Sequence, residues 1–240
     1  MDRPYVICHM LQSIDGRIAG NFFRNVATQE ITSVYNQMSN KYDADAIIYG
    51  SRTANEIYTQ GYISNSNQIH NVKTQKKDFI FMNEKTKWLV VVDALGTLNW
   101  NLDNLKNERL KDRNVIEILS ENVSDTYTDY LRKLGISYIF AGKEKLSMKI
   151  ALEKLKNKFH IETALLQGGG IVNASFSNEN LIDEISLIIS PVVDGESNIP
   201  SSFETSDFVK PLLRSTSEYS IVKTEILQRS GFWINYVKNR

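Results

Sequence analysis

The chain has 240 residues, of which 42% are hydrophobic, and this is enough apolar material for a packed core. Its 28 lysines and arginines balance 28 aspartates and glutamates, so net charge gives no reason to expect nucleic acid or an anionic membrane as a partner. The single cysteine, Cys8, excludes an internal disulfide and a thiolate cluster within one chain, and its apolar neighbours predict a core position.

The N-terminus has no signal-peptide layout, and no stretch reaches the roughly 18 uninterrupted apolar residues of a membrane-spanning helix. We therefore expect a cytoplasmic protein with no membrane partner. Along the chain, apolar runs of strand length alternate with helix-like stretches, which predicts an α/β fold with a mainly parallel sheet and helices on both faces. The predicted strands are 5–11, 46–50, 79–82, 88–93, 115–119, 138–141, 163–167 and 185–190. The predicted helices are 28–40, 53–59, 103–111, 125–134, 147–158 and 171–177.

Three segments give more detailed predictions. The helix 147–158 is expected to bury Ile150, Leu152, Leu155 and Phe159 on one face. Polar residues dominate 63–77, which predicts a long loop. Residues 220–228 and 232–237 flank a turn and predict a closing antiparallel hairpin. Because no linker or charge block divides the chain, we predict a single domain over residues 1–240.

A triple glycine is the most informative local feature. Gly168, Gly169 and Gly170 stand between an apolar strand-like run and a helix start. Glycine is costly in regular structure, so three together indicate a backbone with positive φ or one that something approaches closely. Unpaired N–H groups at a helix start make this a candidate cradle for phosphate, although a plain strand-to-helix turn would give the same pattern.

Two further strand ends carry glycine. One is Gly50-Ser51-Arg52-Thr53, where the hydroxyls of Ser51 and Thr53 can cap the helix or bind a phosphate and Arg52 can pair with one. The other is Ala141-Gly142. Ligands of open α/β sheets collect at the carboxyl ends of strands, so three such ends predict one crevice for an extended dinucleotide. The glycine patterns of Walker and Rossmann sites are absent, which disfavours ordinary nucleotide hydrolases and dehydrogenases.

Near the N-terminus, Ser13-Ile14-Asp15-Gly16 places a hydroxyl and a carboxylate at a tight turn after a strand. Ser-Ile-Asp-Gly-Arg-Ile-Ala, Asp-Ala-Ile-Ile-Tyr-Gly-Ser-Arg-Thr and the run from Gln-Gly-Gly-Gly to Ser-Pro-Val-Val-Asp-Gly resemble the three signature blocks of the riboflavin-biosynthesis reductases. That family forms the C-terminal half of bacterial bifunctional deaminase-reductases. The blocks occur in family order over residues 4–195.

This resemblance implies a dihydrofolate reductase-like fold of three layers and an NADPH-dependent reductase, with NADH not excluded. It places the dinucleotide on residues 50–53 and 168–170, with Ala141-Gly142 a less specific addition, and Ser13 and Asp15 at the nicotinamide and substrate end. In the parent activity, the ribosyl group of 5-amino-6-(5-phosphoribosylamino)uracil is reduced to ribityl by hydride transfer to C1. Asp15 is expected to orient the substrate or relay a proton, or else to have a purely structural turn role. The resemblance also favours a homodimer.

The chain departs from the family at three points. Gln167 stands where a glutamate usually precedes the triple glycine. Residues 55–58 and the polar loop replace an Asp-x-Pro-x-Leu segment near the expected phosphoribosyl group. The segment after Asp93 lacks the usual residues for a 2′-phosphate, which leaves Arg52 and Thr97 as possible contacts. A reductase of another pteridine, pyrimidine or carbonyl substrate, or a non-catalytic nucleotide-binding member of the fold, therefore remains an alternative.

Other chemistries lack their residues. A fused deaminase needs His-x-Glu and Pro-Cys-x-x-Cys around zinc, and this chain has one cysteine. The Gly-x-Ser-x-Gly elbow of many serine hydrolases is absent. His9, His70 and His160 show no ligand spacing, so no metal is predicted. Asp183 and Glu184 are adjacent, and side chains at adjacent strand positions point to opposite faces, which disfavours shared acid–base work.

Overall fold

The computed structural model describes residues 2–63, 76–205 and 216–239. Over these residues the chain forms two compact units, which are described one at a time. Unit 1 contains residues 45–162 and the N-terminal residues through Pro4, and unit 2 contains residues 5–44 and 163–240. The single domain over residues 1–240 stays a prediction, and most of the predicted polar loop 63–77 lies outside the described residues.

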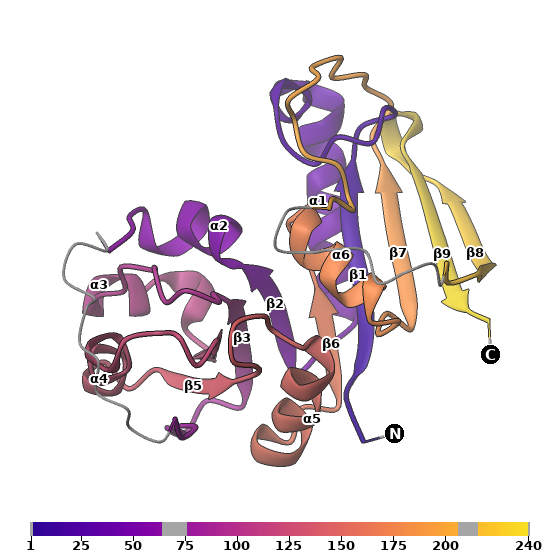
Figure 1. Ribbon diagram of the computed structural model, residues 1–240. Helices are drawn as coiled ribbons and strands as arrows, with labels where there is room; N and C mark the ends of the chain where they lie inside the picture. Colours follow the sequence, from indigo (N-terminus) through magenta and orange to yellow (C-terminus); the bar gives the residue numbers. More distant parts are fainter. Residues whose placement is uncertain (1, 64–75, 206–215, 240) are drawn as a thin grey trace. The chain divides into compact units, whose positions relative to one another are not determined.

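Unit 1 is built on four parallel strands, which lie in the order β5, β4, β3, β2. Figure 1 labels β2, β3 and β5. Their bounds are β2 Ala46–Gly50, β3 Lys87–Val92, β4 Arg113–Leu119 and β5 Ser137–Phe140. These strands are nearly continuous apolar runs, as expected for parallel strands that are buried on both faces. The helices are α2 Ser51–Ala54, which continues into a π-helix Asn55–Thr59, α3 Leu102–Leu105, a 3-10 turn Glu108–Leu110, α4 Asp125–Lys133 and α5 Met148–Phe159.

Helix α5 shows where periodicity succeeds and where it fails. Ser147 caps the helix by accepting a hydrogen bond from the backbone N–H of Ile150, at 3.4 Å. The buried face contains Met148, Ala151, Leu152, Leu155 and Phe159, which follow helical spacing. The prediction for Ile150 was wrong, since it is 42% exposed. It lies two residues from both Met148 and Leu152, and that spacing places it on a different side of the helix.

The predicted strand 79–82 was also wrong. Only Phe79 pairs, in an isolated antiparallel bridge with Tyr138. Beyond this bridge, the Ser137 hydroxyl accepts from the backbone N–H of Phe81 and donates to its carbonyl oxygen. The Ser137 side chain therefore satisfies the backbone N–H and carbonyl groups of Phe81, which would otherwise be available to pair with a neighbouring strand.

Unit 2 contains a mixed sheet in the order β6, β1, β7, β9, β8 (Figure 1). The strands are β1 Tyr5–Gln12, β6 Thr163–Leu166, β7 Glu184–Ile189, β8 Tyr219–Ile226 and β9 Phe232–Lys238. Strand β1 is parallel to β6 and β7, whereas β9 is antiparallel to both β7 and β8. The closing hairpin is therefore confirmed, with a 3-10 turn Gln228–Ser230 at its tip. Helices α1 Val26–Lys41 and α6 Gly170–Asn178 and a 3-10 turn Asn21–Arg24 complete this unit.

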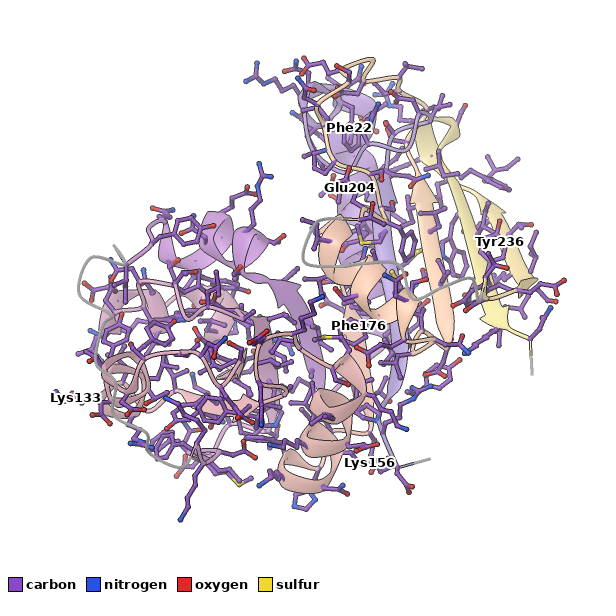
Figure 2. All side chains as sticks on the ribbon, in the orientation of Figure 1. Phe22, Lys133, Lys156, Phe176, Glu204 and Tyr236 are labelled. Carbon is purple, nitrogen blue, oxygen red and sulfur yellow. The ribbon has the colours of Figure 1, made fainter. Side chains whose placement is uncertain are left out.

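Unit 2 has its own buried core. Phe22 and Phe176, both labelled in Figure 2, are 2% and 0% exposed. Cys8 is fully buried, which confirms its predicted core position. Within the described residues, no helix is long and apolar enough to cross a membrane.

Candidate functional site

The triple glycine joins β6 to α6, as predicted. Strand β6 ends at Leu166, and α6 begins at Gly170 with Gly169 as its N-cap. Gly168 has a φ of +89°, a conformation that side chains other than glycine rarely adopt. A Cβ on Gly170 would clash with the carbonyl oxygen of Ser201, so this glycine is required by close packing of the chain itself.

Gly169 differs from its two neighbours. Its φ of −67° and ψ of −172° are extended values that any residue can adopt. Because glycine has no side chain, Gly169 cannot cap α6 with a side-chain oxygen. The first backbone N–H groups of this nine-residue helix therefore lack a side-chain acceptor from the N-cap residue. These groups and the positive end of the helix dipole suit an anion such as a pyrophosphate.

Gln167, which immediately precedes the triple glycine, is 8% exposed. Its side-chain amide donates a hydrogen bond to the Ser39 hydroxyl of α1, at 3.0 Å. Glutamine at this position therefore carries no charge but still makes a hydrogen bond.

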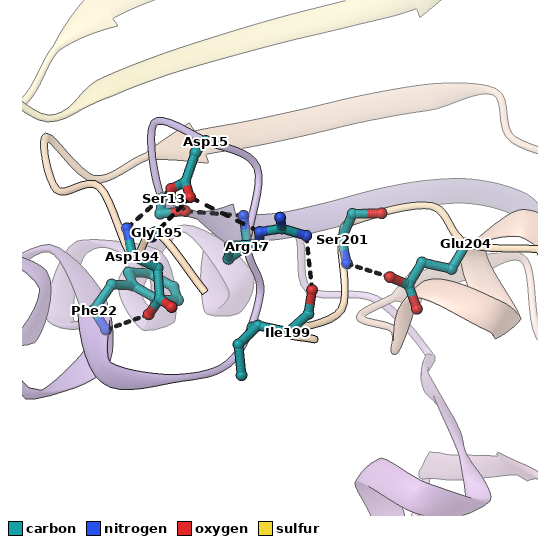
Figure 3. A network of polar contacts seen from close by, with 9 residues as sticks. All are labelled: Ser13, Asp15, Arg17, Phe22, Asp194, Gly195, Ile199, Ser201 and Glu204. Atoms are coloured by element: carbon teal, nitrogen blue, oxygen red, sulfur yellow. Dashed lines mark hydrogen bonds and ion pairs between the residues drawn. The ribbon is translucent and has the colours of Figure 1, made fainter. Parts of the chain in front are cut away.

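Ser13 and Asp15 form a hydrogen-bonded corner after β1 (Figure 3). The buried Ser13 hydroxyl donates to the Asp15 carboxylate at 2.6 Å. The backbone N–H groups of Asp194 and Gly195 each donate to that carboxylate at 3.0 Å. The Ser13 hydroxyl also accepts the N–H of Arg17, at 2.9 Å, which closes the turn.

This corner fixes the charge state of Asp15. The hydrogen bond from Ser13 lowers the pKa of Asp15 most, followed by those from Asp194 and Gly195, so the pKa lies well below its usual range. At neutral pH the carboxylate is ionised and acts as an acceptor. The geometry thus suits orientation better than proton donation, while the catalytic role of Ser13 and Asp15 stays a prediction.

Residues 192–204 link this corner to the triple glycine within unit 2. The Arg17 guanidinium donates to the carbonyl oxygen of Ile199 at 2.9 Å, and Arg17 forms a β-bridge with Ser201 (Figure 3). The backbone N–H of Glu204 donates to the Gly170 carbonyl oxygen at 3.0 Å. The Glu204 carboxylate accepts the N–H of Ser201 at 2.8 Å. Ser201 and Glu204 were not predicted from the sequence, because their partners Arg17 and Gly170 lie far away along the chain.

In unit 1 the second glycine segment follows β2. Gly50 is the N-cap of α2 and has extended backbone angles, with no side-chain cap. The predicted capping by Ser51 or Thr53 was therefore wrong, because α2 begins at Ser51 and both residues belong to the helix itself. The Arg52 side chain is 82% exposed, with Nε 3.5 Å from the Glu56 carboxylate. Its guanidinium can therefore reach an anion in solvent.

The third glycine segment, Ala141-Gly142, follows β5. Gly142 has a φ of +146°, and a Cβ on it would clash with the Lys145 carbonyl oxygen. Its own loop therefore requires this glycine. Because β2 to β5 are parallel, Gly50 and Ala141 lie at the carboxyl-end edge of the unit 1 strands. The binding of one dinucleotide by the glycine segments of both units stays a prediction.

Among the described residues, no group of three or more His, Cys, Asp or Glu side chains could hold a metal ion. His9 is buried between the Ser186 hydroxyl, at 2.9 Å, and the Tyr35 carbonyl oxygen, at 3.0 Å. Burial lowers its pKa to about 4, so it is neutral. His160 ends α5 in a left-handed conformation, and His70 lies outside the described residues.

Asp183 and Glu184 have separate structural partners. Asp183 accepts the backbone N–H of Val6 at 2.9 Å. Glu184 accepts the hydroxyls of Tyr5 and Tyr42, at 3.2 and 3.1 Å. The two carboxylates therefore do not form one acid–base pair.

Known proteins match this chain over most of its length. The sequence profile of the RibD C-terminal domain matches residues 4–225. A curated relative from Aquifex aeolicus, 2,5-diamino-6-ribosylamino-4(3H)-pyrimidinone 5′-phosphate reductase, is 26% identical over 217 residues, which cover 88% of this chain and 87% of the relative.

Two solved structures share the fold. RibD of Acinetobacter baumannii is 18% identical with a TM-score of 0.63 over 100% of this chain, which spans 59% of the RibD chain. A pyrimidine reductase-like protein of Corynebacterium diphtheriae is 18% identical with a TM-score of 0.64 and is matched over 99% of this chain and 92% of its own. These similarities confirm the predicted α/β fold, which this chain shares with RibD and with the pyrimidine reductase-like protein.

Proposed function

Since the chain belongs to the RibD C-terminal domain family, we propose that it is an NADPH-dependent reductase of riboflavin biosynthesis that reduces the ribosyl group of a phosphoribosylamino-pyrimidine. The observation that carries the proposal is the match to a reductase along nearly the whole of both chains. The resemblance seen in the three sequence blocks is thereby confirmed. A non-catalytic member of the fold is disfavoured because the Ser13–Asp15 corner is intact.

The proposed substrate is a 5-amino-6-(phosphoribosylamino)pyrimidine with either an amino or an oxo group at C2. The Aquifex aeolicus relative is named for the 2,5-diamino compound. The sequence blocks also resemble enzymes that act on the uracil compound. Measuring the reduction of both compounds separates these candidates, because the two differ only in the group at C2.

The chain's own residues account for binding and orientation. Residues 168–170 at the start of α6 would hold the pyrophosphate through backbone N–H groups, because no side chain caps that helix start. Residues 50–53 and Ala141-Gly142 are the proposed contacts to the rest of the dinucleotide. Bound NADPH supplies the hydride, and the protein aligns donor and acceptor carbons and excludes water.

Asp15 is proposed as the residue that keeps the substrate end in place. Its carboxylate joins the turn after β1 to the backbone of Asp194 and Gly195. Its lowered pKa leaves no proton to donate at neutral pH, so the proton that accompanies hydride transfer comes from another source.

The preference for NADPH over NADH rests on Arg52 within the proposed site. Its exposed guanidinium is held only loosely, at 3.5 Å from Glu56, and guanidinium groups pair well with phosphates. The Thr97 hydroxyl donates its single proton to Asp93, at 3.0 Å. It therefore has no proton left to donate to a phosphate oxygen. A cytoplasmic location and a homodimer also remain part of the proposal, the latter supported by exposed apolar residues along β8.

Substitution of Gly169 tests the pyrophosphate site, because its φ and ψ do not require glycine. Gly169→Val should weaken NADPH binding at least about 100-fold in a fluorescence titration, and Gly169→Ala should weaken it less. Unfolding midpoints measured on the same samples separate a lost site from a lost fold. Wild-type affinity in a folded Gly169→Val protein would reduce the triple glycine to a structural turn. Failure of the wild type to bind either NADPH or NADH at millimolar concentration would refute the reductase proposal.

A further inference from the structure

A buried acid lies in the middle of unit 1, and the proposed reaction makes no use of it. Glu117 of β4 is 0% exposed. The indole N–H of Trp100 donates to its Oε1 at 2.5 Å. The Tyr127 hydroxyl of α4 lies 3.0 Å from both carboxyl oxygens and 3.2 Å from the carbonyl oxygen of Leu98.

The hydrogen-bond pattern is complete only when Glu117 carries a proton. Trp100 to Glu117, Glu117 to Tyr127 and Tyr127 to Leu98 are three contacts. An ionised Glu117 leaves two protons for these three contacts, from the indole and the phenol. A protonated Glu117 donates to Tyr127, which donates to Leu98, so each contact has one proton.

The surroundings of Glu117 also favour its protonated form. Burial raises the pKa of Glu117 well above its usual value, and the nearby charge of Asp93 raises it further. Asp93 itself is 2% exposed, but its carboxylate accepts two backbone N–H groups and one hydroxyl from Thr97 and Leu98. Because Asp93 has these donors, the ionised form of this acid pair is best placed there and the proton on Glu117.

The same contacts hold the loop from Asp93 to Trp100, which follows β3. Tyr127 and Tyr130 of α4 donate to the carbonyl oxygens of Leu98 and Trp100. On the other side, the backbone N–H of Ser120 donates to the Ala94 carbonyl oxygen at 3.1 Å. The loop lies at the carboxyl-end edge of the unit 1 strands, the edge that also carries Gly50 and Ala141.

We propose that Glu117 is a positioning residue that, as a neutral acid, ties Trp100 to α4 and thereby fixes the Asp93–Trp100 loop for nucleotide binding. The nucleotide part of this inference rests on the proposed function. The part that concerns the loop and the proton stands on the contacts of Glu117 alone.

The test compares Glu117→Leu, which removes the polar contacts, with Glu117→Gln, whose amide can accept from Trp100 and donate to Tyr127. Infrared spectroscopy of the wild type should show the carbonyl band of a buried protonated carboxylic acid, and both variants should lack it. Amide hydrogen exchange of residues 94–99 should quicken about tenfold or more in Glu117→Leu and stay near wild type in Glu117→Gln. NADPH affinity should fall about tenfold in Glu117→Leu and change less than about twofold in Glu117→Gln.

Each outcome decides a different point. Absence of the acid band in the wild type overturns the neutral acid. Unchanged exchange and unchanged NADPH affinity in Glu117→Leu overturn the positioning role. If Glu117→Leu does not fold, Tyr127→Phe, which loses only a hydroxyl, provides the same comparison. If the wild type binds neither NADPH nor NADH, the proposed function fails and hydrogen exchange alone decides whether Glu117 positions the loop.

Discussion

Asp15 in unit 2 and Glu117 in unit 1 are both carboxyl groups hydrogen-bonded to a hydroxyl and to N–H groups, but their surroundings shift their pKa values in opposite directions. The Asp15 side chain is 27% exposed and receives three donors, so its pKa is lowered. Glu117 is fully buried near a second acid, so its pKa is raised. The comparison teaches that donors alone do not decide the charge of an acid, because access to water and neighbouring charge weigh as heavily.

The two acids also differ in what they hold. Asp15 links segments of one unit that lie 179 and 180 residues apart in sequence. Glu117 links a strand to a loop and a helix only 17 and 10 residues away. We therefore expect Asp15 to matter most for activity and Glu117 most for stability.

The largest expected effect is on stability. Glu117→Ala should lower the free energy of unfolding by about 3 kcal/mol, because it leaves a cavity and removes the hydrogen-bond partner of the buried Trp100 indole and Tyr127 hydroxyl. Urea unfolding measures this loss. Glu117→Gln is the control and should lie within about 1 kcal/mol of the wild type. A wild-type stability for Glu117→Ala would show that the buried network contributes nothing.

The next effect is on activity. Asp15→Ala should reduce kcat/KM about 10- to 100-fold, because the turn after β1 and the backbone of Asp194 and Gly195 lose their shared acceptor. Steady-state kinetics check this, with Asp103→Ala as a control at a carboxylate that is 93% exposed. Equal kcat/KM in the two variants would leave Asp15 as a purely structural turn residue.

The last effect is on the pH dependence of stability, and its sign differs between the two acids. The folded pKa of Glu117 is raised, so its contribution to stability is complete below the unfolded value of 4.5 and is lost as pH rises through the folded pKa. The folded pKa of Asp15 is lowered, so its contribution is complete above 3.8 and is lost as pH falls through the folded pKa.

Unfolding curves recorded between about pH 5 and about pH 8 should therefore show a slope from Glu117 that Glu117→Gln removes, up to about 1.4 kcal/mol per pH unit. Asp15→Asn should leave that slope unchanged and flatten only the loss below pH 3.8. If Glu117→Gln kept the wild-type slope above pH 5, the slope would not come from the titration of Glu117.

Much of the fold could be predicted from local pattern. Seven of the eight predicted strands and the closing hairpin are present, because buried parallel strands are continuous apolar runs between turn residues. The exception, 79–82, is apolar as well, but the Ser137 side chain takes the backbone groups of Phe81. The helix predicted over 103–111 divides into α3 and a 3-10 turn, with Asn107 capping the second piece.

The candidate site could be predicted only in part. The glycine segments and the Ser13–Asp15 turn are visible as short motifs. The reason for each glycine is not, because Gly170 packs against Ser201 and Gly142 against Lys145. Glu117 gave no signal, since it is one polar residue inside an apolar strand and its partners come from other elements.

The reductase claim is tested most directly by following deuterium from reduced cofactor labelled at the transferable position of the nicotinamide. The purified protein would be mixed with labelled NADPH and, in separate reactions, with the 2,5-diamino pyrimidinone ribosyl phosphate and its uracil counterpart. We predict that one of the two yields a ribityl product with one deuterium at C1, identified by mass spectrometry and NMR. Reduction of neither compound by a folded protein that binds NADPH would contradict the account.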